Sequence, residues 1–182
     1  MAAAIEIIRN LLKEADQRRA QLLVREAEDL LAFAGEDPTV LGFARRQVEA
    51  ARALAPDDSR VALTLAKLDA QSGAYDAARA SLAGILRAHS RNAEALHEMG
   101  MLLEETGDLP SARLHLQKAV TEVRRSHPRW GALAYLSLAE LESTAGNHAL
   151  ARELARGGIA HLGKRRIDVR VLRDFLARSR TA

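Results

Sequence analysis

The stretch GAYDAARASL, residues 73–82, has two counterparts downstream: GDLPSARLHL at residues 107–116 and GNHALARELA at residues 146–155. Each begins with glycine, places an Ala-Arg pair after four further residues, and has leucine or alanine four residues after the alanine of that pair. A partial copy, ARRQV at residues 44–48, keeps the Ala-Arg pair and the apolar position but lacks the glycine. This recurrence predicts a chain built from repeated supersecondary units.

The alanines of the Ala-Arg pairs set the length of the repeat. They stand at positions 44, 78, 112 and 151, which gives separations of 34, 34 and 39 residues. The last separation is five residues longer, and the extra residues fall in RRSHPRWG, residues 124–131. In this segment we expect Pro128 to open a new helix. We expect Trp130, the only tryptophan, either to fill the gap made by the insertion or to contact a ligand.

The composition indicates an all-α protein. Of the 182 residues, 48% are hydrophobic but only 3% are aromatic, so the mixture favours helices over sheets. The absence of cysteine excludes disulfides and cysteine-based zinc sites. No apolar run approaches the roughly 18 residues that cross a bilayer, and the N-terminal segment is a poor signal peptide. We therefore expect a cytoplasmic protein without membrane insertion.

The residues around each Ala-Arg pair resemble the tetratricopeptide repeat, a helix–turn–helix unit of 34 residues. In that family a leucine and a small residue in helix A precede the alanine of helix B. The corresponding residues here are Leu65-Ala66 with Ala78, Met99-Gly100 with Ala112, and Leu138-Ala139 with Ala151. The resemblance implies a right-handed superhelical solenoid of about four repeats, with a capping helix at each end. The expected segments are 1–24 (N-terminal cap), repeats 25–58, 59–92, 93–131 and 132–163, and 164–182 (C-terminal cap).

The small residues then have a packing role. Helices A and B cross closely, so we expect small side chains on the A side of each crossing, at Ala32, Ala66, Gly100 and Ala139. Glycine is expected to end the A helices in a left-handed conformation, at Gly73, Gly107 and Gly146. The first repeat departs from the pattern, with Glu28 at a usually bulky position. The aromatic residue expected late in helix A is replaced in every repeat, by Gly35, Asp69, Leu103 and Glu142.

The two ends lie outside the repeat register. Residues 3–34 contain no glycine or proline and predict either one long helix or a capping helix that breaks near Asp16. Near the C-terminus, Asp168 is a candidate N-cap. It precedes a helix whose apolar face we expect to cover the last repeat, with Val171, Leu172, Phe175 and Leu176 on that face.

Patterns for catalysis are weak. GIAHLGKR, residues 158–165, approaches a Walker A motif but lacks the Ser or Thr that must follow the lysine to hold magnesium. None of the six histidines forms a pair at the i, i+4 spacing of a metalloprotease helix. We therefore expect no enzyme activity, no cofactor and no metal.

The family resemblance implies that peptides or partner helices bind a concave surface lined by the A helices. The candidate lining residues are Leu63, Lys67, Glu94, His97, Glu98, Met101, Glu105, Leu136 and Glu140. Acidic residues dominate this set, whereas the arginines of the B helices are expected on the outer face. The partner is therefore expected to be a cationic or amphipathic protein segment, and the chain an adaptor, assembly factor or chaperone.

Two other functions remain open. The basic convex face and the C-terminal helix favour a binder of nucleic acid or another anionic surface, although no aromatic residues interleave with the arginines as in single-strand binders. The apolar N-terminal helix favours a self-associating scaffold, a homodimer in its simplest form.

Overall fold

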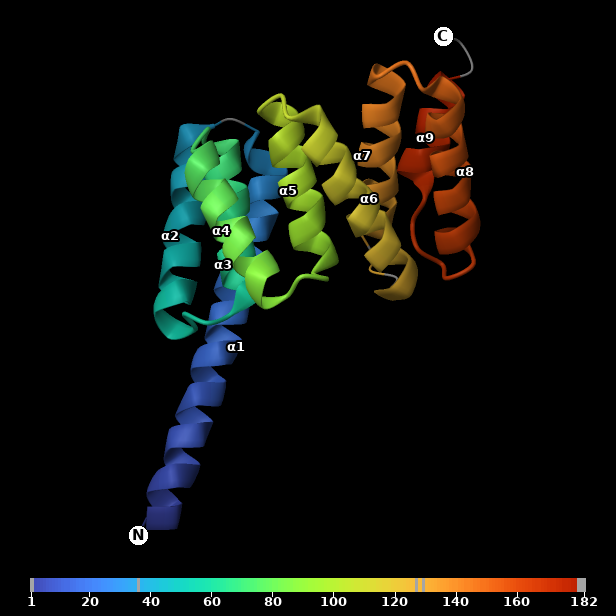
Figure 1. Ribbon diagram of the computed structural model, residues 1–182. Helices are drawn as coiled ribbons and strands as arrows, with labels where there is room; N and C mark the ends of the chain where they lie inside the picture. Colours follow the sequence, from blue (N-terminus) through green and yellow to red (C-terminus); the bar gives the residue numbers. More distant parts are fainter. Residues whose placement is uncertain (1, 36, 127, 129, 180–182) are drawn as a thin grey trace. The chain divides into compact units, whose positions relative to one another are not determined.

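The computed structural model describes residues 2–35, 37–126, 128 and 130–179. Within these residues the chain forms nine α-helices and no strand, which confirms the all-α class (Figure 1). The helices are α1 Ala2–Ala34, α2 Pro38–Leu54, α3 Ser59–Gln71, α4 Tyr75–Ala88, α5 Ala93–Glu105, α6 Leu109–Ser126, α7 Gly131–Thr144, α8 His148–Gly163 and α9 Arg170–Arg178.

The chain divides into two compact parts, an N-terminal unit of residues 1–85 and a C-terminal unit of residues 86–182. The boundary falls inside α4, whose buried face carries Ala78, Leu82 and Ile85. Each unit is described by itself.

In the N-terminal unit, α1 is one continuous helix, with no break near Asp16. It packs along α2, and the shared core contains Ala20, Val24 and Ala27 of α1. These residues recur at i, i+4 and i+7, the spacing of one helix face. The facing side chains of α2 are Leu41, Ala44, Val48 and Ala51.

The first repeat differs from the sequence-based expectation in its turn. Gly35 directly follows α1 with a positive φ of 52°, so it ends this helix as the other glycines end theirs. It stands nine residues before Ala44, whereas Gly73 stands five residues before Ala78. The prediction that this repeat lacks a turn glycine is therefore wrong. Because the turn comes four residues earlier, Ala32 lies past the crossing and is exposed instead of packed.

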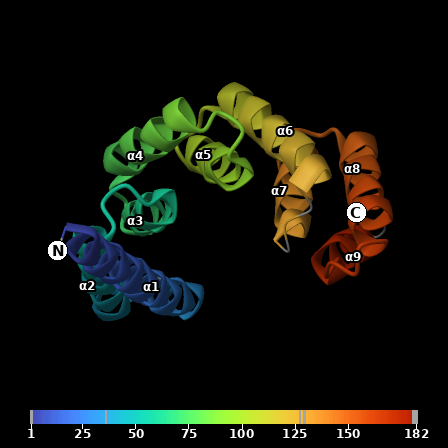
Figure 2. The same ribbon diagram turned by 90° about the horizontal axis from the view of Figure 1, so that it is seen from below.

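In the C-terminal unit, α5 lies beside α6 and α7 beside α8 as antiparallel helix pairs (Figures 1 and 2). Ala112, Ala139 and Ala151 are 0–1% exposed, which confirms their place at the crossings. At Gly100 a Cβ atom would stand 2.6 Å from Leu116 Cγ, so only glycine fits that approach of α5 to α6. The turn glycines Gly107 and Gly146 have positive φ values of 85° and 83°, as predicted.

The five-residue insertion is absorbed mainly by helix. α6 has 18 residues where α4 has 14, so about one extra helical turn precedes the connection to α7. α7 begins at Gly131, and Pro128 lies outside it, so the prediction that this proline opens a helix is wrong. Gly131 is fixed by its surroundings, because a Cβ there would stand 2.8 Å from Val123 Cγ1.

Two arginines of the recurring Ala-Arg pairs form ion pairs between helices. This corrects the prediction that they only face outward. Arg45 Nη2 donates to Asp69 Oδ1 at 2.7 Å, joining α2 to α3. Arg113 donates through Nε and Nη2 to Glu142 at 2.6 and 3.2 Å, joining α6 to α7. Both acidic residues occupy the position where the family pattern has an aromatic residue. Each arginine thus links helix B of one repeat to helix A of the next, and we call these contacts the arginine clasps.

The C-terminal helix α9 packs on α7 and α8. Leu172 and Phe175 are buried against the last repeat, while Val171 is 37% exposed. Asp168 Oδ1 accepts a hydrogen bond from the Arg170 backbone N–H at 2.9 Å. The N-cap of α9 is Val169, so the prediction of Asp168 as the N-cap is wrong by one residue. Arg152 of the last Ala-Arg pair reaches the Ser179 carbonyl oxygen at 3.4 Å, so α9 takes the place of a following repeat.

Candidate functional site

One side of α5 and α7 gathers most of the sequence-predicted candidates. Residues of α5 that recur at three- and four-residue spacing share one stripe, and the same holds for α7. The two helices contact each other within the C-terminal unit. We define the acidic face as Glu98, Met101, Glu104, Glu105, Leu136 and Glu140; Glu94 lies at the N-terminal end of the same α5 stripe.

The acidic face is partly exposed and electrostatically strained. Met101 is 40% exposed, and the side chain of Glu140 is 49% exposed. Burial raises the pKa of Glu104 above its ordinary value, and the negative charges of Glu140 and Glu105 raise it further. Charges from both α5 and α7 therefore act on the carboxyl of Glu104. The three-residue spacing from Met101 places Glu104 on the same stripe of α5.

His97 lies beneath this face instead of lining it. It is 8% exposed, and its Nε2 lies 2.9 Å from Ser137 Oγ of α7. Its ring also packs against Trp130, with centroids 5.7 Å apart. The prediction that His97 lines the groove is therefore wrong. The histidine joins α5 to α7, and Trp130 covers it. This contact agrees with the first of the two predicted roles of Trp130, which was to fill the gap made by the insertion.

The cluster of Ser137, His97 and Glu98 has the order of a nucleophile, a base and an orienting carboxylate, with His97 Nδ1 3.4 Å from Glu98 Oε1. Ser137 is buried in the middle of α7, where the backbone N–H groups around it are used by the helix. Acyl transfer needs N–H donors aimed at a developing oxyanion. These three residues therefore form a polar contact network between α5 and α7.

The C-terminal helix borders the acidic face. Arg178 Nη2 lies 3.9 Å from Glu140 Oε1. A hollow of about 410 Å³ lies between α7 and α9 and is lined by Glu140, Ser143, Thr144, Phe175, Arg178 and Ser179. The edge of the acidic face already accommodates one guanidinium of the chain itself.

The remaining candidates belong to α3 of the N-terminal unit. Leu63 is 4% exposed and packed in the core, so it offers no side chain to a partner and its candidate role is corrected. Lys67 is half-buried. Arg60, on the same helix, donates through Nε to Glu28 Oε1 at 3.2 Å, which explains the acidic residue at a usually bulky position.

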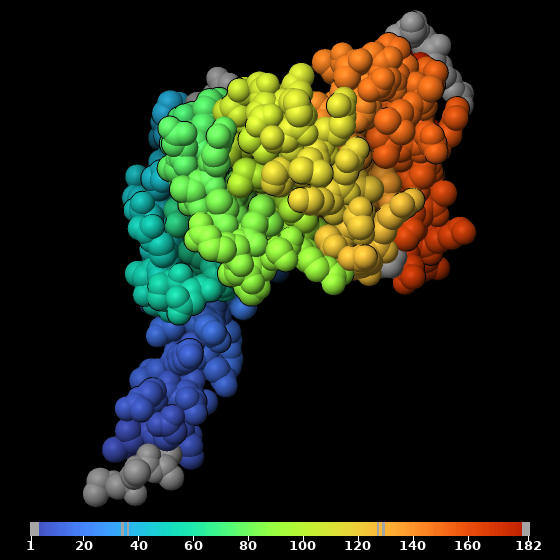
Figure 3. Space-filling model, in the orientation of Figure 1, coloured from blue at the N-terminus to red at the C-terminus, as the bar shows by residue number. Residues whose placement is uncertain are grey.

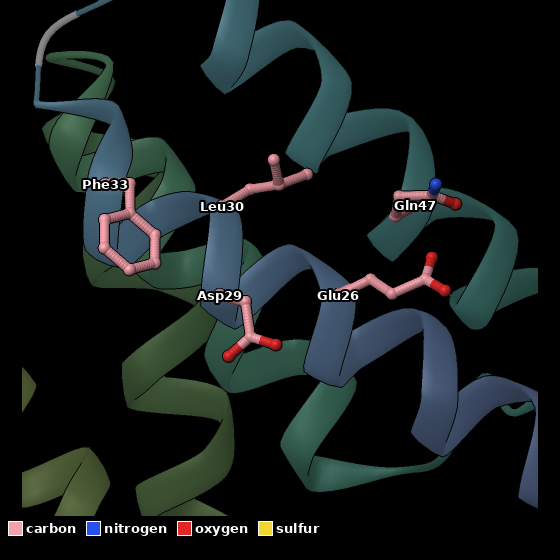
Figure 4. Close-up of a pocket in the computed structure, with 5 residues that line it drawn as sticks. All are labelled: Glu26, Asp29, Leu30, Phe33 and Gln47. Carbon is pink, nitrogen blue, oxygen red and sulfur yellow. The ribbon is translucent and has the colours of Figure 1, made fainter.

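A shallow hollow of about 380 Å³ flanks α1 and α2 in the N-terminal unit. Leu30 and Phe33 supply apolar surface, and Glu26 and Gln47 extend across the space between the two helices (Figure 4). Asp29 adds a second carboxylate at its edge. Among the described residues, no group of three or more His, Asp or Glu side chains is arranged to hold a metal ion.

Comparison with known proteins agrees with the helix pairs and their spacing. A family model described as tetratricopeptide repeat matches residues 69–134, from the second repeat into the start of the fourth. Residues 69–134 of the chain are tetratricopeptide repeats. Its fold is that of a protein-interaction module. No helix in the described part of this repeat protein is long and apolar enough to cross a membrane.

Known relatives of this repeat protein share short segments or the fold. Cellulose synthase operon protein C of Xanthomonas axonopodis pv. citri (strain 306) is 39% identical over 69 residues, which are 38% of this chain but 5% of that protein. A solved structure from the functional characterization of Pseudomonas aeruginosa pilF has a TM-score of 0.66 and 16% identity. The match covers 91% of this chain and 78% of the other chain. A MamA structure has a TM-score of 0.54 and 18% identity, covering 78% of this chain and 87% of its own. The two structures share the fold with this chain.

Proposed function

We propose that the acidic face binds a cationic, amphipathic segment of a partner protein, and that the chain acts as a non-enzymatic adaptor or assembly factor. The single observation that carries this proposal is that the negative charges of Glu105 on α5 and Glu140 on α7 both act on the half-buried carboxyl of Glu104. Carboxylates that repel one another in a partly dehydrated site are stabilised by an incoming cation.

Apolar side chains between the carboxylates suit an amphipathic partner. Met101 and Leu133 are 40% and 45% exposed, and Leu136 is half-buried on the same side of α7. Methionine adapts its shape to different partners. A helix or extended segment with leucines on one side and lysines or arginines beside them matches this surface in both polarity and charge.

The test is titration of the full chain with a labelled amphipathic peptide that carries alternating leucine and lysine faces. The double variant Glu105→Lys/Glu140→Lys is expected to raise the Kd about tenfold or more, because two attractive contacts become repulsive. A matched control, Glu49→Lys/Glu153→Lys, makes the same change in net charge at exposed positions of α2 and α8. Equal weakening in both variants, or no binding by the wild type, contradicts the proposal.

The pH dependence of binding gives a second test. Because the pKa of Glu104 is raised, this carboxyl takes up a proton at a higher pH than an ordinary glutamate does. The affinity for a cationic peptide is therefore expected to be highest near neutral pH and to decline through the raised pKa of Glu104. Glu104→Gln should remove the earliest part of this decline in isothermal titrations. An unchanged pH profile in this variant would separate Glu104 from partner binding.

The raised pKa of Glu104 also predicts how this residue affects the stability of the fold at different pH values. A carboxyl whose pKa is higher in the folded state than in the unfolded chain binds protons more tightly when folded. Its charge therefore costs stability at neutral pH, and that cost disappears as the pH falls through the folded pKa. Glu104→Gln is accordingly expected to unfold at a higher denaturant concentration than the wild type at pH 7, with the difference shrinking in acid.

The alternative function is nucleic-acid binding by the basic residues of the B helices. Several of their arginines are engaged within the chain: Arg45 with Asp69, Arg113 with Glu142, and Arg125 with Glu122 at 2.8 Å. A titration with single-stranded DNA that is steeply salt-dependent, and lost in Lys118→Glu/Arg156→Glu, would support that alternative.

A further inference from the structure

The C-terminal ends of α6 and α8 lie side by side at one edge of the C-terminal unit. A Cβ atom on Gly131 would stand 2.8 Å from Val123 Cγ1 of α6 and 3.5 Å from Leu162 Cδ2 of α8, so the two helix ends meet at the start of α7. The gold end of α6 and the orange-red segment after α8 are both seen at the lower edge of this unit (Figures 1 and 3). The residues that follow Val123 and Leu162 therefore share this edge.

These residues carry a concentration of positive charge. We define the basic edge as Arg124, Arg125, Lys164, Arg165 and Arg166, all of which are exposed. Two acidic residues are close to them in the sequence, and both are bound by arginines: Glu122 by Arg125 at 2.8 Å and Asp168 by Arg170 at 2.6 Å. In the part of the chain that the structure describes, no ion pair engages Lys164, Arg165 or Arg166.

The turn after α8 differs from the other helix ends at one position. The backbone N–H of Arg166 donates to the Gly163 carbonyl oxygen at 3.1 Å, and that of Ile167 donates to the Leu162 carbonyl oxygen at 3.3 Å. The turns after α3, α5 and α7 contain the same two hydrogen bonds, with a glycine of positive φ in the place of Arg166: Gly73, Gly107 and Gly146. Arg166 has a φ of 58° and is the only described residue other than glycine with a positive φ.

An arginine in this conformation is not required by the fold. The left-handed conformation is unfavourable for a residue that has a Cβ atom, whereas glycine adopts it freely. Attraction to the negative end of a helix accounts for Arg124 and Arg125, which lie in the last turn of α6. It does not account for a cation in a left-handed turn where three equivalent turns have glycine. Such strained positions are concentrated at functional sites, and the charge of Arg166 enlarges the basic edge.

We propose that the basic edge binds a segment of a partner protein that is rich in aspartate and glutamate. The chain's own Glu122 shows how arginines at this edge hold a carboxylate. It accepts hydrogen bonds from Arg125 Nη1 at 2.8 Å and from Arg91 Nη2 at 3.0 Å. The planar guanidinium group matches the two oxygens of a carboxylate. Arg165 and Arg166 offer the same group to carboxylates of another protein.

The composition of the basic edge disfavours two other anionic partners. None of the exposed large apolar side chains belongs to this edge, whereas helices that lie on a lipid surface bury an apolar face beside their basic residues. No aromatic residue stands among its five cations, whereas proteins that hold single-stranded nucleic acid stack the bases on aromatic side chains. An acidic peptide requires neither feature, because its carboxylates pair directly with the cations.

The proposal goes beyond the acidic face, because it assigns a second surface to a partner of the opposite charge. The test is fluorescence anisotropy of a labelled oligoglutamate peptide titrated with the full chain. Arg124→Gln/Arg165→Gln is expected to raise the Kd about tenfold, because two attractive contacts are lost. The variant Glu105→Lys/Glu140→Lys should bind this peptide at least as tightly as the wild type does. Failure at one surface is therefore distinguishable from failure at the other.

The matched control is Lys118→Gln/Arg156→Gln, which removes the same charge from exposed positions of α6 and α8 away from the edge. It should change the Kd by less than about twofold, because surface charges are screened beyond roughly 10 Å. Equal weakening in this control, or no binding by the wild type, overturns the proposal. Tighter binding of single-stranded DNA or of anionic vesicles than of the peptide, at the same ionic strength, overturns the choice of partner.

Arg166→Gly separates the charge of this residue from its place in the turn. Glycine adopts the left-handed conformation freely, so the variant is expected to melt at a higher temperature than the wild type. Its Kd for the peptide should nevertheless rise about threefold or more, because one cation of the edge is lost. An unchanged Kd would contradict the binding role of Arg166. A lower melting temperature would show that the arginine stabilises the turn itself, and would overturn the functional explanation of its conformation.

Discussion

Replacing Arg113 with leucine is expected to lower the free energy of unfolding of the C-terminal unit by about 3 kcal/mol. The substitution removes two hydrogen bonds to Glu142, whose side chain is 2% exposed, and leaves a buried carboxylate with Asn147 as its remaining side-chain donor, at 2.7 Å. The loss falls at the low end for a broken buried pair because Arg113 is itself 38% exposed and water can replace part of it.

The measurement is urea unfolding followed by the fluorescence of Trp130, which reports on the C-terminal unit because it is the only tryptophan. Arg113→Leu/Glu142→Leu serves as the control, since removing both partners avoids the stranded charge and is expected to recover most of the stability. Arg45→Leu should cost less, because Asp69 is 14% exposed and closer to water. If Arg113→Leu unfolds at the wild-type midpoint, the clasp contributes nothing to stability.

Gly157 and Gly158 are neighbours in α8, and alanine is expected to have opposite effects at the two positions. At Gly158 a Cβ would stand 2.7 Å from Leu172 Cδ1 and 2.8 Å from Tyr135 Cγ. Tyr135 is 1% exposed and cannot retreat, so Gly158→Ala should destabilise by about 1–3 kcal/mol and loosen α9. At Gly157 no atom lies within 4 Å of a Cβ, so Gly157→Ala should stabilise the helix by about 0.5–1 kcal/mol.

The pair is measured by thermal unfolding of the two single variants beside the wild type. Gly157→Ala controls for the gain in helix propensity that both alanines share. The difference between the two melting temperatures therefore reports the steric cost at Gly158. Equal melting temperatures would mean that α9 and Tyr135 shift to accommodate the new Cβ with no loss of stability, which would contradict the packing described.

Repetition made the fold predictable. The crossings at Ala112 and Ala151 could be placed because each has equivalents at a constant separation, so an error at one position would conflict with the others. The first repeat broke this consistency: Gly35 carries out the turn four residues early, and Ala32 was placed at the wrong depth. Because Gly35 and Ala44 are further apart than the equivalent residues of the other repeats, the positions of helix A in the first repeat cannot be assigned from the other repeats.

The site was predictable where it depended on one helix and unpredictable where it depended on several. The spacing of Glu98, Met101 and Glu105 on α5 follows from helix geometry alone. The burial of His97 required Trp130, which reaches it from the insertion. The partners of Arg45 and Arg113 required knowledge of which A helix lies beside each B helix, and a sequence pattern records arginine only as a charge.

The arginine clasps have a consequence for how such chains change length during evolution. Arg45 and Asp69 are separated by 24 residues, and Arg113 and Glu142 by 29, yet both pairs close. The additional residues entered between the two clasp positions, mostly as one more turn of α6. A duplicated or recombined repeat can therefore differ in size from its neighbours and still dock, provided that the length is gained in near-whole turns at the far end of helix B. Chimeric arrays that join repeats of unequal length should be designed with their junctions there.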